Sequence, residues 1–141
     1  MAFTLANAGA FAMAGDGTHT GLLTLLNGGF IKFYGGTQAA TPDTAPSGSP
    51  LASFQLANPA ATVNSAGVMT FTPPANTAIA NADTATTVTW FRITSAGGTN
   101  IGDGTVGLTG ADVNFSTLNG GVSWITGGTC VLSSFVLTVT H

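Results

Sequence analysis

The nucleophilic and ionisable side chains of this chain are few and far apart. Its 141 residues include one cysteine, two histidines, two basic residues and five acidic residues, all of them aspartate. Cys130 would need a neighbouring base to act as a nucleophile, and neither His19 nor His141 has the sequence context of such a base. Because Cys130 opens an apolar stretch, we interpret it as a small core residue. As the only cysteine, it also excludes an intrachain disulfide.

No metal or phosphate motif is formed by the remaining polar residues. The aspartates lie singly, at positions 16, 43, 83, 103 and 112, whereas a Ca²⁺ site needs about six oxygen ligands. His19 lacks the second histidine of a zinc-binding pair. The run GDGTVG at 102–107 has the glycines of a phosphate loop but not its lysine, and we interpret Gly102-Asp103-Gly104 as turn chemistry. We therefore expect no catalytic residues, no metal and no cofactor, and conclude that this is not an enzyme.

The composition of the chain limits its possible partners. Charged residues make up 5% of the sequence, against about 25% in ordinary globular proteins. Two basic residues cannot neutralise several phosphates, so direct nucleic-acid binding is not expected. No apolar run approaches the roughly 18 residues of a membrane span, and residues 10–14 lack the basic flank of a signal peptide. Low charge favours association, so we expect a homo-oligomer or a place in a larger assembly.

The strongest structural signal lies between residues 86 and 112. Residues 87–94 combine β-branched and aromatic side chains that alternate on two faces, with Trp90 and Arg92 on one and Phe91 on the other. Such a segment is typical of a central strand. Gly97 and Gly98 then turn the chain into a second strand at 100–106.

Arg92 requires a partner if it is buried, because a buried charge is stable only when it is paired. Asp103 and Asp112 are the nearest carboxylates in the sequence. We predict a structural role for Trp90, Arg92, Asp103 and Asp112. An arginine that faces another subunit remains the alternative.

The remaining strands are short and separated by turn residues. They are predicted at 30–34, 51–56, 68–72, 77–80, 113–115, 122–125 and 130–140. The last of these is the longest, and its nearly strict alternation predicts one face formed by Val131, Ser133, Phe135, Leu137 and Val139. About eight strands of this kind predict an all-β fold, an antiparallel β-sandwich with jelly-roll or Greek-key connections.

Two segments lie outside this strand pattern. Residues 1–27 are predicted as an N-terminal arm, and residues 28–141 as the sandwich domain. The arm is expected to contain one short helix near residues 5–14 and a second over Leu22 to Leu26, with Thr18 as the N-cap of the second helix. The arm either covers one end of the sandwich or grips another subunit. The loop at 35–50 is long and rich in proline, as functional loops often are. Predicted interface residues are Phe3, Leu5, Phe11, Met13, Thr41, Pro42 and Asp43.

Three stretches carry a resemblance to a known group of proteins. They are the NGG-x-hydrophobic-basic-x-Tyr opening at Asn27 to Tyr34, the Trp-Phe-Arg strand at Trp90 to Arg92, and the Asp-Gly…Gly-x-x-Gly-Ala-Asp-hydrophobic-Asn segment at Asp103 to Asn114. In these motifs the chain resembles small head cement or decoration proteins of tailed double-stranded DNA bacteriophages and prophages. The GDGTHTG stretch at 15–21 departs from the continuous N-terminal helix that the resemblance implies.

This resemblance implies a jelly-roll-like structural protein of the virion. Such a protein is made in the host cytoplasm, binds the major capsid protein on the outer surface of the capsid and bridges capsomers. The alternative function is a tail-fibre or carbohydrate-binding β-sandwich module. That alternative needs exposed aromatic side chains, for which Tyr34, Trp90 and Trp124 are the candidates.

Overall fold

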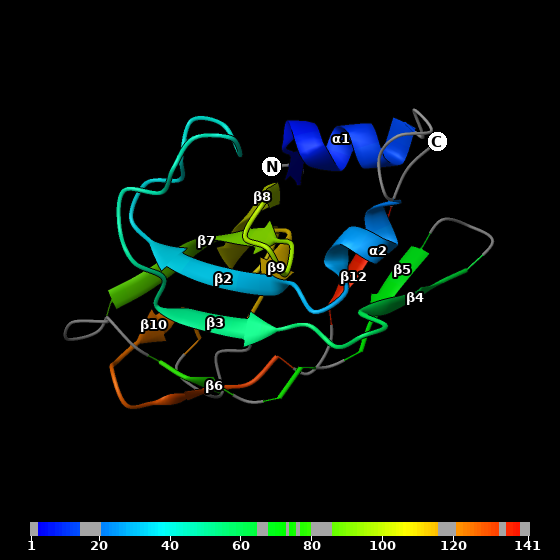
Figure 1. Ribbon diagram of the computed structural model, residues 1–141. Coiled ribbons are helices and arrows are strands. Elements are labelled where there is room, and N and C mark those ends of the chain that lie inside the picture. The colour runs from blue at the N-terminus through cyan, green and yellow to red at the C-terminus, as the bar shows by residue number, and fades with distance from the viewer. Residues whose placement is uncertain are drawn as a thin grey trace.

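The computed structural model describes residues 3–14, 21–64, 68–72, 74–75, 77–79, 86–115, 121–132 and 135–138 (Figure 1). In this part of the chain the structure is sandwich-like and mostly antiparallel β, with two short helices. The predicted all-β fold class is therefore confirmed. The one parallel pair among the described strands joins β8 and β9.

The main sheet contains the predicted hairpin at its centre. Its strand order is β1-β8-β7-β2-β3, with β9 paired to β8 and β10 paired to β7. The strands of this sheet are β1 (Thr4–Leu5), β2 (Phe30–Gly35), β3 (Ala52–Gln55), β7 (Thr86–Thr94), β8 (Asn100–Gly107), β9 (Val113–Asn114) and β10 (Ser123–Trp124). Gly98 takes a φ of 86° in the turn between β7 and β8, which glycine adopts without strain.

Two smaller sheets complete the second side of the fold, at the right and bottom of Figure 1. One has the order β12-β5-β4 and the other pairs β11 with β6. Their strands are β4 (Ala61–Val63), β5 (Val68–Phe71), β6 (Thr77–Ala78), β11 (Thr129–Cys130) and β12 (Val136–Thr138). β4, a three-residue strand with two exposed residues, was not predicted from the sequence.

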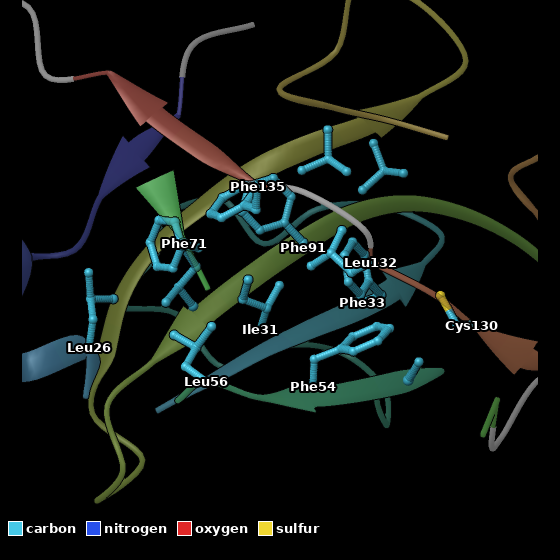
Figure 2. Packing of buried hydrophobic residues seen from close by; sticks show 14 of the residues in the cluster. Leu26, Ile31, Phe33, Phe54, Leu56, Phe71, Phe91, Cys130, Leu132 and Phe135 are labelled. Carbon is cyan, nitrogen blue, oxygen red and sulfur yellow. The ribbon is translucent and has the colours of Figure 1, made fainter. Parts of the chain in front are cut away.

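Aromatic and aliphatic side chains together fill the space between the sheets (Figure 2). Phe33 of β2 lies opposite Phe91 of β7 in the sheet register, and both are fully buried. From the second side, Phe135 meets Phe91 edge-on at 5.7 Å between ring centroids and meets Phe71 at 4.8 Å. This core explains the two-sided pattern of β7, since Trp90 and Arg92, on its other face, are buried as well.

Two glycines of β8 let these rings lie against its main chain. A Cβ on Gly104 would lie 2.5 Å from two atoms of the Phe91 ring, and a Cβ on Gly102 would lie 2.5 Å from the ring of Phe3. The interpretation of Gly102-Asp103-Gly104 as a turn is therefore wrong. These residues are the middle of a strand, and the glycines are needed for close packing rather than for bending.

We expect Gly104→Ala to lower the free energy of unfolding by about 1–3 kcal/mol, because Phe91 is fully buried and has no room to move. Gly48→Ala is the matched control, since a Cβ there would meet nothing within 4 Å. Urea unfolding of both variants measures the difference. Equal stability of the two would contradict the packing role of Gly104.

The predicted final strand at 130–140 is wrong as a single element. Cys130 belongs to β11, which pairs with β6, whereas β12 begins at Val136 and pairs with β5. Val131 is 53% exposed although Phe135 is buried, so the two do not share an inward face. Leu137 lies in β12, and Ser133 and Val139 lie outside the described residues.

The N-terminal segment is joined to the main sheet. β1 pairs with β8, and α1 (Asn7–Ala14) follows it directly. α2 (Leu22–Leu26) buries Leu22 and Leu26 in the core. Its N-cap is Gly21, with no side-chain hydrogen bond, while Thr18, the predicted cap, lies outside the described residues.

Candidate functional site

A buried ion pair lies at the centre of the main sheet. Arg92 and Asp103 face each other across β7 and β8. Nε and Nη2 of Arg92 donate to Oδ1 and Oδ2 of Asp103, each at 2.6 Å. The two residues are 1% and 0% exposed. Of the two predicted partners for Arg92, the structure selects Asp103.

The remaining donors of Arg92 hold the loop at 36–50. Nη1 donates to the main-chain carbonyl of Thr44 at 2.7 Å, and Nη2 reaches the carbonyl of Thr41 at 3.4 Å. Nearby, the side-chain amide of Asn100 donates to the carbonyl of Pro42 at 2.9 Å. The loop therefore lies over this face of the sheet, held through the carbonyls of Thr41, Pro42 and Thr44.

An aromatic stack extends this face along β2 and β7. The rings of Tyr34 and Trp90 are stacked at 4.4 Å between centroids, and the Arg92 guanidinium lies 5.4 Å from the Trp90 ring centroid. Burial raises the pKa of Tyr34, an effect that the positive charge of Arg92 partly offsets. The indole Nε1 of Trp90 is buried without a hydrogen-bond partner among the described residues. Tyr34, Trp90 and the third candidate for a sugar platform, Trp124, are all buried.

Asp112, which was considered as a partner for Arg92, forms hydrogen bonds with Thr105 instead. Its Oδ2 accepts hydrogen bonds from the main-chain N–H of Thr105 at 2.8 Å and from the Thr105 hydroxyl at 2.7 Å. In return, the Thr105 hydroxyl accepts from the N–H of Asp112 at 3.2 Å. Asp112 thus fixes the connection between β8 and β9 and leaves Arg92 to Asp103.

The predicted interface residues of the loop differ in exposure. Thr41 and Asp43 are exposed, whereas Pro42 is buried between them. Pro42 is therefore not part of the exposed surface of the loop, and its carbonyl accepts the hydrogen bond from Asn100 of β8.

Two of the predicted interface residues of the N-terminal segment pack against other parts of the same chain. Phe3 is half-buried and stacks on Phe91 at 6.0 Å between ring centroids. Leu5 is also half-buried, in β1 beside Gly102. The side chains of Phe11 and Met13, in α1, lie outside the described part of the structure.

The loop and the N-terminal segment meet at Asp43. The main-chain N–H of Asn7, the first residue of α1, lies 3.4 Å from each carboxylate oxygen of Asp43. Figure 1 shows the loop rising beside the start of this helix. A negative charge is favourable there because the first N–H groups of a helix carry partial positive charge.

Few charges remain on the described surface. Arg92 and Asp103 neutralise each other in the interior. The other charged side chains that the structure describes are Lys32, Asp43 and Asp112. Lys32 lies 5.7 Å from the Phe30 ring centroid, and Asp16 and Asp83 lie outside the described residues. The surface around the loop is thus formed mainly by neutral side chains.

Among the described residues, the nucleophilic and metal-binding candidates do not form a cluster. Cys130 is buried, as predicted, and burial raises the pKa of its thiol to about 12, so the reactive thiolate is scarce at neutral pH. In the described part of the chain, no three His, Cys, Asp or Glu side chains gather as metal ligands would. Neither α1 nor α2 has the length and apolarity needed to cross a membrane.

The contacts of the loop were missed at the sequence level. Arg92 binds main-chain carbonyls of Thr41 and Thr44, and a carbonyl is present at every residue, so it leaves no signal in the sequence. The one residue that could have indicated a contact with the loop is Asn100, a polar residue at the start of β8, opposite Thr94.

Comparison with known proteins adds no relative. The chain matches no family model, no curated protein and no solved structure. Its function has to be argued from its own residues.

Proposed function

We propose that this protein is a capsid decoration, or cement, subunit. In this role it binds the major capsid protein on the outer surface of a phage head and bridges capsomers. The stabilisation is additive, because many weak contacts repeated by symmetry raise the stability of the shell. The motif resemblance at Asn27 to Tyr34, Trp90 to Arg92 and Asp103 to Asn114 supports this role.

The observation that carries the proposal is the anchored loop at 36–50. A loop of this length is costly to order during binding, but here the Arg92 and Asn100 contacts hold it in place before any partner arrives. Its exposed residues include Thr41, Asp43 and Ala45. An exposed, pre-ordered and nearly uncharged loop suits a neutral protein partner.

The carbohydrate-binding alternative is not supported by a comparable observation. Its recognition surface would need aromatic side chains that a sugar can reach. The three candidates, Tyr34, Trp90 and Trp124, are at most 5% exposed.

We predict that binding to phage heads assembled without this protein is insensitive to salt. The Debye length falls from about 10 Å at 0.1 M to about 3 Å at 1 M salt, which weakens electrostatic complexes but not apolar burial or neutral hydrogen bonds. We expect equal occupancy of the heads at both salt concentrations, measured by sedimentation of heads with bound protein. Release of the protein at 1 M salt would contradict a neutral interface.

The location of the interface is tested in the same assay with Ala45→Asp. Ala45 is exposed in the loop, so a new charge there must lose its hydration on docking, and affinity should fall at least about tenfold. Ala75→Asp, exposed in the connection between β5 and β6, is the matched control and should bind normally. Point variants are preferable to deletion of residues 2–14, because deletion would also remove β1 and the Phe3–Phe91 stack.

A further inference from the structure

Two segments that are distant in the sequence contact each other at one point. The loop at 36–50 approaches the N-terminal segment through Asp43, whose carboxylate oxygens both lie 3.4 Å from the N–H of Asn7. Each segment has its own attachment to the main sheet, so this contact joins two separately seated elements.

The attachment of the loop depends on the buried ion pair. Asp103 fixes the Arg92 guanidinium through two hydrogen bonds, and the same group then binds the carbonyls of Thr41 and Thr44 on either side of Asp43. The N–H of Thr44 also donates to the carbonyl of Thr41 at 3.0 Å. These bonds fix the turn that presents the Asp43 carboxylate to α1.

The attachment of the helix is a close approach to β8. The N–H of Ala6 donates to the carbonyl of Ile101 at 2.8 Å. A Cβ on Gly9 would lie 2.5 Å from the same carbonyl, so α1 packs on the strand through the bare backbone of a glycine. The register of β1 against β8 therefore sets the position of the first N–H groups of α1.

We propose that the loop and α1 form a coupled strap, in which Asp43 transmits the order of one element to the other. The strap begins at the Arg92–Asp103 pair, passes through residues 41–44 and ends at the start of α1. A partner that contacts the loop would thereby also tighten the helix. This inference goes beyond the proposed capsid role and is tested on the isolated protein, so either can fail without the other.

Asn7→Pro is the variant that separates the two elements. Proline removes the N–H that faces Asp43, yet it is tolerated at the first position of a helix, where that N–H has no intrahelical partner. The complementary variant, Asp43→Ala, removes the carboxylate. Ser47→Ala, exposed in the same loop, is the control that leaves the contact intact.

The readout is amide hydrogen exchange by nuclear magnetic resonance at two reporters. These are the N–H of Thr44 in the loop and the N–H of Ala10 in α1, which donates to the carbonyl of Ala6 just before the helix. We expect Asn7→Pro to accelerate exchange at Thr44, and Asp43→Ala to accelerate it at Ala10, each by about two- to fivefold, the range of a charge at a helix end. The double variant should exchange no faster than the singles, because both remove one contact. Unchanged exchange at the distant reporter, or fully additive effects, would overturn the coupling.

Discussion

Asp103→Ala is expected to lower the free energy of unfolding by about 3–5 kcal/mol, the cost of breaking a buried ion pair by removing one partner. Arg92 would be left as a buried cation without its carboxylate partner. Its remaining acceptors would be the carbonyls of Thr44 and Thr41, which carry no compensating charge. The total stability of a domain is about 5–15 kcal/mol, so this substitution should remove a large part of it.

Arg92→Met is expected to cost less than Asp103→Ala. It removes the guanidinium with its five N–H donors, whereas Asp103→Ala leaves that guanidinium buried with main-chain carbonyls as its only acceptors among the described residues. The double variant Arg92→Met with Asp103→Leu should recover most of the loss, since a buried pair replaced by apolar groups of similar size is often neutral.

Thermal melts of these variants give the comparison. For a chain of this length, a loss of 1 kcal/mol lowers the melting temperature by about 3 °C. Asp112→Ala is the matched control, because Asp112 bonds only Thr105 among the described residues and should cost about 1–2 kcal/mol. If Asp103→Ala melts no lower than Asp112→Ala, the ion pair does not hold the sheet as we argue.

The hairpin was predictable because its signal is local. A strand with apolar side chains on both faces must be central, and the glycine turn joins it to its antiparallel neighbour. The exact pairing was not predictable, because the register shifts between Ile93 and Thr94 and this shift places Arg92 opposite Asp103. The alternative partner, Asp112, lies beyond the end of β8, where local pairing no longer constrains its position.

The segment 130–140 was predicted as one strand because its apolar residues alternate. That alternation does not show that the segment pairs first with one sheet and then with another. Leu132 and Phe135 are both buried although they are three residues apart, and Val131 and Val136 are both exposed. The segment pairs with β6 through β11 and then with β5, in another sheet, through β12. Side-chain periodicity shows which residues prefer the core, but not which sheet receives them. The contact of Asp43 with α1 is equally hidden, since it depends on how the loop lies over the sheet.

Phe33→Ala is expected to lower the free energy of unfolding by about 3–5 kcal/mol, comparable to the loss of the ion pair. Phe33 is fully buried and its ring contacts four others, with centroid distances from 5.5 to 6.1 Å. These neighbours are Phe54, Phe91, Phe115 and Trp124. Phe54 belongs to β3, Phe91 to β7 and Trp124 to β10, and Phe115 directly follows β9. A cavity at Phe33 would therefore weaken the packing of all these elements.

Phe30→Ala is the control that separates this position from aromatic content in general. Phe30 lies in the same strand but on the opposite face and is half-buried, with Lys32 over its ring. It should cost no more than about 1 kcal/mol. Urea unfolding followed by the fluorescence of the tryptophans measures both changes, and Phe33→Leu should fall between them because it keeps most of the buried volume. Similar midpoints for Phe33→Ala and Phe30→Ala would mean that the core is not organised around Phe33.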